Sequence, residues 1–357
     1  MSGGSRRPAR RWSTRAGRSR SGSLLSRTPC QPLNPLAPIP AAAASWARLH
    51  AEMAEQRLPA WQPSAPRSDW PALASGATPA GAVGFLWGPP GSAVERVAAV
   101  LANGLPAFRA DRFSPTPPGD GLQQYRAIAE LAAGTLDPAT LVGQWRAGLP
   151  GRGIEDGQVV DWLPYWDNAL LLALRPGLAD ALLLIALRDP RDMLLDWLAF
   201  GTSLPPLAMA SPLAAATWLA QVLEQVAALH EQDLFPHRVL RLDDVLDDPQ
   251  ALATVDAAAI ETPLPAPPAA LLGPRCFAAG HWRAYADALA EPFAVLAPVA
   301  RRLGQDGVCF FVREAVRTAN HAPRKAPALG HATFVELNKD RVREAIDLWF
   351  EAANTVA

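Results

Sequence analysis

The sequence has few cysteines and almost no net charge, and each shortage excludes a class of protein. Its three cysteines, Cys30, Cys276 and Cys309, are isolated and odd in number, so they form neither a metal-binding spacing nor a disulfide framework. This usage is typical of a reducing compartment, and we expect a cytoplasmic protein without a bound metal. A formal net charge of −1 over 357 residues is not the basic field of a nonspecific nucleic-acid binder, so no nucleic-acid partner is expected.

Long apolar runs are also missing. The most apolar stretch, Ala169 to Leu187, is interrupted by Arg175, Pro176 and Asp180, which favours a buried helix followed by a strand over a membrane span. No internal repeat with a period near 34 residues is visible. The chain has instead 50% hydrophobic residues, enough for a substantial core, and 36 prolines that limit its helical stretches.

The two ends of the chain are poor core material. Residues 1–40 are rich in Arg and Ser, and no acidic residue precedes Glu52. Disordered tails, organellar transit peptides and basic tails that bind polyanions share this composition. We expect residues 1–81 to be disordered apart from one helix at Ala41 to Gln56, with a linker rich in Pro, Ala and Ser at Pro59 to Pro79.

The pattern predicts one domain over residues 82–304 and a tail over residues 305–357 with one helix at Lys339 to Asn354. Within the domain, extended stretches alternate with helical ones, which predicts an α/β fold with a mostly parallel sheet flanked by helices. The expected extended stretches are Val83–Trp87, Ala107–Phe113, Gln158–Leu163, Ala181–Leu187 and His237–Leu242. The expected helices are Ala93–Asn103, Leu122–Ala133, Pro138–Gly148, Trp166–Leu174, Arg191–Phe200, Pro212–Glu231, one beginning at Asp243 to Asp247, Gly280–Ala290 and Pro292–Leu303.

Two turns of this domain could bind an anion. Gly88-Pro89-Pro90-Gly91-Ser92-Ala93 joins a strand to a helix, where small residues let backbone N–H groups and the helix start approach a phosphate. No Gly-Lys-Ser/Thr follows, so this is not a Walker loop, and an ordinary turn remains the alternative. Arg188-Asp189-Pro190-Arg191-Asp192 follows the most apolar strand. Arg188 could fork onto phosphate oxygens, or it could pair with neighbouring carboxylates.

Three further segments gain meaning only from their order. They are Asp161-Trp162-Leu163-Pro164 with Asp167-Asn168, Arg241-Leu242-Asp243-Asp244-Val245, and Trp282-Arg283-Ala284-Tyr285. Together with the two turns, the series resembles the bacterial tetratricopeptide-linked sulfotransferases. That family has Gly-x-Pro-Arg-Ser-Gly-Thr-Ser/Thr after its first strand, then Asp-Lys-x-Pro, Arg-Asp-Pro-x-Asp-x-x-x-Ser, Tyr-Glu-Asp-Leu and Trp-x-x-Tyr. The resemblance covers about Val83 to Gly304.

The resemblance implies a P-loop-kinase-like sulfotransferase fold and the donor 3′-phosphoadenosine-5′-phosphosulfate (PAPS). Gly88, Pro90, Gly91, Ser92 and Ala93 would then hold the 5′-phosphosulfate. Arg188 would hold the 3′-phosphate, and Asp111 is the carboxylate nearest the position of the family's base. A salt bridge between Asp111 and the flanking arginines Arg109 and Arg112 is the alternative. The acceptor would be a hydroxyl on a peptide or a glycan.

The chain departs from the family pattern at the positions that bind the donor. Gly91 stands where the family has Arg, Ala93 where it has Gly, and Val94 and Glu95 where it has hydroxyl residues. Trp162 stands in the place of the family's Lys, and Asp196 in the place of the Ser that binds the 3′-phosphate. Two functions follow: sulfuryl transfer from PAPS, or a noncatalytic pseudo-sulfotransferase that acts as a binding or scaffolding module.

Overall fold

A computed structural model describes residues 41–45, 48, 61–74, 83–200, 211–273 and 276–304. The helix expected at Ala41 to Gln56 is helical over residues 41–45, where it is described. The expectations for residues 1–40 and for the helix at Lys339 to Asn354 lie outside the described residues.

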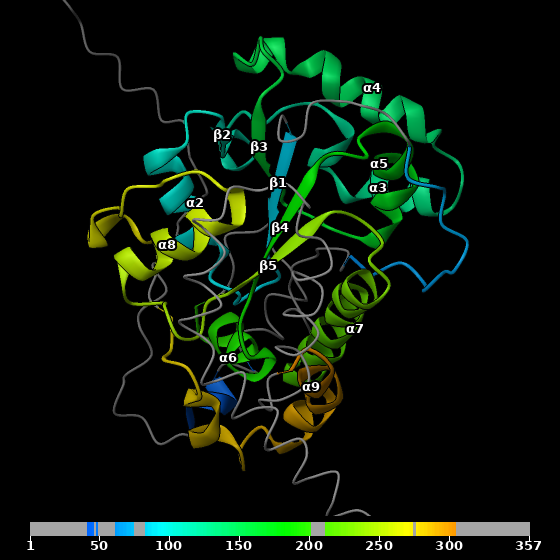
Figure 1. Cartoon of the computed structure of the whole chain (residues 1–357). Helices are drawn as coiled ribbons and strands as arrows, with labels where there is room; N and C mark the ends of the chain where they lie inside the picture. Colours follow the sequence, from blue (N-terminus) through cyan, green and yellow to red (C-terminus); the bar gives the residue numbers. More distant parts are fainter. Residues whose placement is uncertain are drawn as a thin grey trace, which may run out of the picture. The chain divides into compact units, whose positions relative to one another are not determined.

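The centre of the domain is a five-stranded parallel sheet (Figure 1). Its order is β2-β3-β1-β4-β5, and every neighbouring pair is parallel, which confirms the expected α/β architecture. The strands are β1 (Val83–Trp87), β2 (Phe108–Arg109), β3 (Val159–Trp162), β4 (Leu182–Leu187) and β5 (His237–Arg241).

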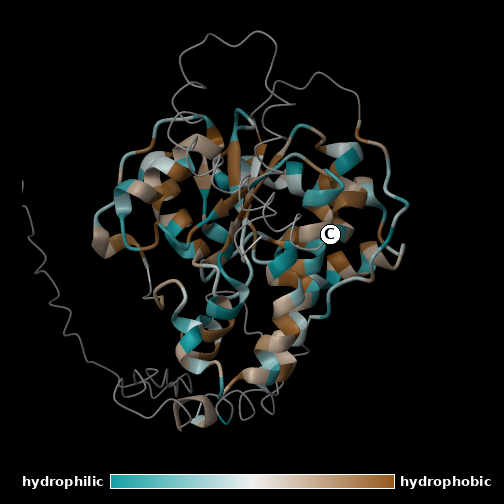
Figure 2. Ribbon diagram, turned by 60° about the horizontal axis from the view of Figure 1, so that its bottom comes forward, coloured by the Kyte–Doolittle hydropathy of each residue, from teal (hydrophilic) through white to brown (hydrophobic). Residues whose placement is uncertain are grey.

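The central strands are apolar on both faces because helices cover both faces. Phe85 and Trp87 of β1 point into one apolar cluster, and Leu86 between them points into the other. All three side chains are fully buried. Alternation of this kind, with no polar face, is what a parallel strand covered by two helix layers requires. Figure 2 shows the hydrophobic strands in the middle of the domain.

Two helix layers of unequal size cover the sheet. The larger layer packs on the face of Phe85 and consists of α3 (Tyr125–Ala132), α4 (Pro138–Gly148), α5 (Leu171–Gly177), α6 (Pro190–Phe200), α7 (Pro212–Glu231) and α9 (Ala290–Arg302). The smaller layer packs on the face of Leu86 and consists of α2 (Val94–Gly104) and α8 (Pro249–Ile260). Short 3-10 turns are η1 (Asp111–Phe113), η2 (Gly121–Gln123), η3 (Pro150–Arg152), η4 (Asn168–Leu170), η5 (Ala269–Leu271) and η6 (His281–Tyr285).

Helix ends with a strong local signal were predicted well. The bounds of α4 and α7 are those expected, and Asp137 caps α4 by accepting the Thr140 N–H, with Pro138 in the first turn. The helix expected to begin at Asp243 to Asp247 was wrong, because α8 begins only at Pro249. The residue before it, Asp248, caps α8 by accepting the N–H groups of Gln250 and Ala251.

The helix predicted at Gly280 to Ala290 was also wrong. This stretch forms the 3-10 turn η6, and α9 begins at Ala290. The physical reason lies in α6, where the Asp192 carboxylate accepts the N–H groups of Gly280 (2.6 Å) and Trp282 (2.8 Å). A distant side chain therefore decides the backbone conformation here, which local sequence cannot show.

Two helices expected in the first half of the domain begin with a 3-10 turn. The Leu122–Ala133 prediction corresponds to η2 followed by α3, and the Trp166–Leu174 prediction to η4 followed by α5. Each turn is preceded by an aspartate, Asp120 or Asp167, whose carboxylate accepts a backbone N–H two residues on.

Residues 61–74, which we call the strap, lie inside the stretch whose composition is typical of a linker. They have no regular secondary structure, yet Trp61 is only 5% exposed and belongs to the larger apolar cluster. The strap is therefore part of the packed domain. Among the described residues, no helix has the length and apolarity needed to cross a bilayer.

Candidate functional site

We use the term crevice for the edge of the sheet at the carboxyl ends of β1 and β4, which are neighbours. From β1 the chain continues into α2 in the smaller layer, and from β4 it continues into α6 in the larger layer. Adjacent parallel strands whose connections leave to opposite faces form a switch point, where α/β proteins bind ligands. The two turns singled out in the sequence, at residues 88–93 and 188–192, border this point.

The turn at residues 88–93, which we call the first loop, packs tightly against α6. Gly91 has φ +75°, and a Cβ on it would lie 2.0 Å from the carbonyl oxygen of Met193. A Cβ on Gly88 would lie 2.3 Å from Ser92 Oγ. Both glycines are therefore required by close approach, and the arginine that the family has at the position of Gly91 does not fit this conformation.

Ala93 at the end of the first loop is in the left-handed conformation, with φ 62° and ψ 30°. This conformation costs an alanine about 1–2 kcal/mol relative to the right-handed one, whereas a glycine adopts it readily. The family has a glycine at this position. The backbone at Ala93 therefore has a conformation that suits a glycine better than an alanine.

Most of the first loop is buried. Gly88, Pro90, Ser92 and Ala93 are all in the buried class, and Ser92 is fully buried. The Ser92 N–H donates to the Pro89 carbonyl (3.1 Å), while its hydroxyl has no hydrogen-bond partner among the described residues. An unsatisfied buried hydroxyl is uncommon, so Ser92 Oγ could still donate a hydrogen bond to a ligand or accept one from it.

Arg188 is fully buried directly beside the first loop. Its guanidinium forms an ion pair with Asp196, donates to the Phe277 carbonyl (2.7 Å), and lies 3.5 Å from the Gly91 carbonyl oxygen. Its Nε lies 3.7 Å from a carboxylate oxygen of Asp243. Arg188 therefore lies beside the first loop, and the carboxylates that it faces belong to the protein itself.

Two carboxylates one turn apart on α6 hold residues 277–282 over the crevice. Asp196 accepts the Phe277 N–H (2.8 Å) in addition to its ion pair with Arg188, and Asp192 accepts the N–H groups of Gly280 and Trp282. Burial raises the pKa of Asp196 to about 6 despite Arg188, and burial also raises the pKa of Asp192. Both side chains act as anchors for a backbone segment.

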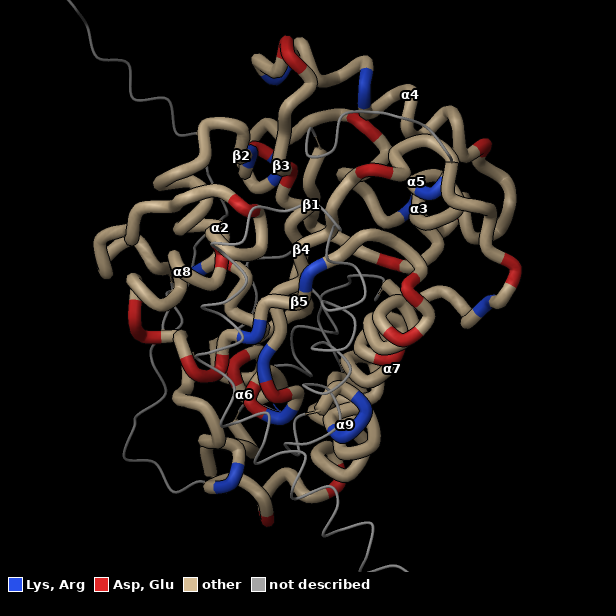
Figure 3. Tube along the Cα trace, viewed as in Figure 1, with Lys and Arg blue, Asp and Glu red and all other residues tan. Residues whose placement is uncertain are grey.

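The turn after β4 is closed by a second set of contacts. Asp243 accepts the Asp189 N–H (3.0 Å), and burial raises the pKa of Asp243. Arg191 forms an ion pair with Asp189 (2.7 Å) and stacks on the Trp282 ring, 3.8 Å from its centroid. Figure 3 shows the resulting mixture of basic and acidic residues around the start of α6.

Asp111 belongs to a separate ion-pair network at β2 and β3. Both of its oxygens bond to Arg152, at 2.7 and 2.8 Å, whereas the expected salt-bridge partners were Arg109 and Arg112. Arg152 also bonds to the fully buried Asp161, which receives further bonds from Arg112 and from Trp145 Nε1. Asp161 is buried, which opposes its charge, but Arg152 and Arg112 lower its pKa.

The sequence analysis did not predict several of the residues that contact Arg188. Asp196 and Asp243 were noted only as departures or as parts of motifs, and Phe277 lies in no motif. The available signal for the ion pair was an acidic residue, Asp196, on the helix that follows Arg188.

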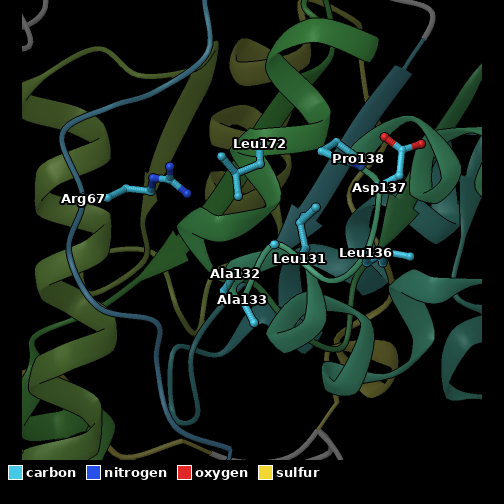
Figure 4. A pocket seen from close by; sticks show the side chains of 9 residues that line it. Arg67, Leu131, Ala132, Ala133, Leu136, Asp137, Pro138 and Leu172 are labelled. Carbon is cyan, nitrogen blue, oxygen red and sulfur yellow. The ribbon is translucent and has the colours of Figure 1, made fainter.

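A pocket in the described part of the chain lies elsewhere. Its volume is about 600 Å³, and it is formed by Arg67 of the strap, the end of α3, the start of α4 and Leu172 of α5 (Figure 4). None of the predicted site residues lines it. In the described part of the chain, no group of three or more His, Cys, Asp or Glu residues could hold a metal ion.

The chain matches no family model, and neither a curated protein nor a solved structure was found to be similar to it.

Proposed function

We propose that residues 83–304 form a sulfotransferase-like domain that does not use PAPS and serves as a noncatalytic binding or scaffolding module. The observation that carries this proposal is the state of Arg188, the residue that would hold the 3′-phosphate. Its side chain is fully buried and is engaged by Asp196, Asp243 and the Phe277 carbonyl. A P-loop-kinase-like arrangement of the sheet is part of the same proposal.

The residues of the crevice do not fit the donor nucleotide. A 3′-phosphate beside Arg188 would meet Asp196, and two like charges 4 Å apart repel by about 4 kcal/mol at an effective dielectric constant of 20. Phosphate binding would also require Arg188 to leave its buried partners. At the 5′ side, the first loop is buried against α6, and Gly91 stands at the position where the sulfotransferases that the sequence resembles have an arginine.

Sulfuryl transfer remains a second candidate because of Ser92. Its buried hydroxyl has no hydrogen-bond partner among the described residues and lies just before α2, whose first backbone N–H groups favour an anion. Asp111 supports this candidate poorly as a base, since both of its oxygens are bonded to Arg152.

A thermal shift measurement with 3′-phosphoadenosine-5′-phosphate tests the proposal. A ligand that binds only the native state raises its stability, so binding appears as a rise in Tm. We expect no rise for the wild-type chain at millimolar ligand. Asp196→Ser, which restores the family's residue and releases Arg188, should gain a rise. Asp192→Ser is the matched control, because it removes a buried α6 carboxylate that does not hydrogen-bond to Arg188.

Two results would decide against the noncatalytic proposal. The first is a clear rise in the wild-type Tm at micromolar ligand that Arg188→Met abolishes. The second is transfer of labelled sulfuryl from PAPS to a hydroxyl acceptor by the wild-type chain but not by Ser92→Ala. Either result would favour the second candidate.

A further inference from the structure

The strap is held in the same way as a bound peptide. Most of its hydrogen bonds use its main chain, and their partners are mainly side chains of the domain rather than other strap residues. Trp218 Nε1 donates to the Trp61 carbonyl (2.6 Å), and the Tyr125 hydroxyl donates to the Gln62 carbonyl. Arg175 of α5 contacts the far end of the strap, donating to the Pro71 carbonyl and accepting the Ala74 N–H.

Ser64 is held on both sides of its peptide unit. Its N–H donates to Asp167 Oδ2 (2.7 Å), and its carbonyl accepts from Gln225 Nε2 (3.1 Å). Gln225 is itself oriented by the Asn168 N–H, which donates to Gln225 Oε1 (3.0 Å). Burial and the charge of Asp167 raise the pKa of Tyr125, so its hydroxyl keeps the proton that it donates. The donors and acceptors of the groove are therefore fixed by the domain.

One side chain of the strap enters an aromatic pocket. The Trp61 ring lies 4.7 Å from Tyr125, 5.3 Å from Tyr165 and 5.1 Å from Trp218, measured between ring centroids. Edge-to-face and tilted contacts at these distances each contribute about 0.5–1.5 kcal/mol beyond area burial. Trp61 is thus an aromatic anchor, and the main-chain bonds set the direction of the segment.

The strap has the composition of a polyproline-type ligand. Its anchor is followed by Pro63-Ser64-Ala65-Pro66, so the pattern is Trp-x-Pro-x-x-Pro. Proline-rich segments are extended and have no internal hydrogen bonds, which leaves their carbonyls available to Trp and Tyr donors on an aromatic-lined groove. The groove here offers both donors, Trp218 and Tyr125.

Two features indicate that the strap does not satisfy the groove completely. The Trp61 Nε1 is buried without a hydrogen-bond partner among the described residues. The pocket of about 600 Å³ shown in Figure 4 adjoins the strap at Arg67, and its other lining residues come from α3, the start of α4 and α5 rather than from the aromatic pocket around Trp61. A peptide ligand with an apolar anchor in place of Trp61, and with a side chain that enters the pocket beside Arg67, would bury more apolar surface.

We propose that the groove between α3, α7 and the loop at residues 163–168 is a binding site for proline-rich peptides of other proteins with an aromatic residue two positions before the first proline. In this chain the strap fills the site in cis. The proposal does not depend on the state of Arg188 or on the noncatalytic assignment of the crevice.

Peptide binding to the full-length chain tests the proposal. A fluorescent peptide with the sequence of residues 59–74 should bind Trp61→Ala in a saturable manner. Tethering gives the wild-type strap an effective concentration in the millimolar range, so the wild-type chain should show no saturation below about 1 mM peptide. We expect at least a tenfold difference in apparent affinity between the two chains.

Variant peptides define the recognition. Replacing the anchor by Phe should leave binding nearly unchanged, since Trp61 Nε1 has no partner among the described residues, and replacing it by Ala should abolish binding. Replacing either proline by Ala should weaken binding roughly 2- to 5-fold, because the free peptide becomes more flexible. Trp218→Phe in the Trp61→Ala background keeps an aromatic ring but removes the donor to the Trp61 carbonyl, and should weaken binding further.

A second variant covers the case in which Trp61→Ala does not fold. Ser64→Pro removes only the N–H that donates to Asp167 and leaves the anchor in place, so the peptide should compete with a weakened strap. The proposal is overturned if either variant is folded by circular dichroism and binds the peptide no better than its scrambled sequence. It is also overturned if the wild-type chain is a dimer by light scattering that exchanges straps between copies, because the occupant would then be a second copy.

Discussion

At the scale of single residues, Gly91 shows how closely the first loop approaches α6. We expect Gly91→Ala to lower the free energy of unfolding by about 3 kcal/mol or more, since a Cβ would combine a positive φ with a 2.0 Å contact to the Met193 carbonyl oxygen. Gly134→Ala is the matched control, with φ +72° and no atom within 4 Å of the added Cβ. It should cost only about 1 kcal/mol in urea unfolding. Equal costs would contradict the contact.

Ala93 provides the opposite case, a residue whose side chain is unfavourable for its backbone. Ala93→Gly should leave the free energy of unfolding unchanged or raise it by up to about 1 kcal/mol, because relief of the left-handed strain offsets the loss of a buried methyl group. Ala98→Gly, at a buried position inside α2, should lower it by about 1 kcal/mol or more. Urea unfolding of both variants measures the difference, and two equal losses would show that Ala93 is not strained.

At the scale of elements, the packing of α8 on α2 contains a carboxyl group in an apolar cluster. Asp256 is 1% exposed, and neither of its oxygens has a hydrogen-bond partner among the described residues. Burial raises its pKa to about 8. Because the folded-state pKa lies above the unfolded one, its stability contribution is complete below about pH 4 and is lost as the pH rises toward 8.

Asp256→Asn should therefore stabilise the chain in a pH-dependent way. We expect a gain on the order of 4 kcal/mol at pH 7 and little gain at pH 4, measured by urea unfolding at both values. Asp244→Asn, at an exposed position before α8, is the control and should show no such dependence. A gain that is the same at both pH values would mean that Asp256 is ionised in the native state near pH 4.

The ion-pair network between β2 and β3 has an interior and an edge. Asp161 is fully buried and pairs with both Arg112 and Arg152, so Asp161→Asn should cost about 1–3 kcal/mol by removing a buried charge that two arginines share, although Arg112 keeps Asp120 and Arg152 keeps Asp111. The Asp111 side chain is a third exposed and is bonded to Arg152, so Asp111→Asn should cost less than about 1 kcal/mol. Chemical denaturation of the two variants checks the order, and a reversed order would contradict the assignment.

The elements themselves were mostly predictable from local pattern. The strands β1 and β4 are apolar runs between turn residues, and α4 has its cap and proline in adjacent positions, so short-range physics determines them. η6 and the strap were not predictable, because their backbones are held by Asp192, Asp167 and Gln225, side chains that lie 88 to 161 residues away.

At the scale of the whole molecule, Arg188 joins parts of the chain that are far apart in sequence. It connects the end of β4 to the first loop, α6, residues 277–282 and the turn after β5. We expect Arg188→Met to lower the free energy of unfolding by about 3–5 kcal/mol, since Asp196 would remain buried without its counter-charge. Adding Asp196→Leu should restore part of the loss, with a coupling of about 0.5–3 kcal/mol in a double-mutant cycle. Additive losses would show that the pair is not formed.

The sequence predicts where the site lies in the sheet, but not which groups its side chains contact. Strand order places the turns after β1 and β4 side by side, and alternating patterns are enough to foresee that. Whether Arg188 faces a ligand or the protein depends on how close Asp196 and Asp243 lie to it. Those distances depend on the three-dimensional positions of α6 and of the turn after β5. Side-chain partners of this kind are long-range properties.

The strap also has a consequence for the order of events during synthesis. Ser64 contacts Gln225, 161 residues later in the chain, so its groove is complete only after α7 has been made. At 5–20 residues per second, the strap leaves the ribosome about 8–32 s before its last partner does. During that interval its two tryptophans and its prolines are available to chaperones and neighbouring chains. The segment that emerges early must therefore dock late, and its docking closes one of the longest loops of the domain.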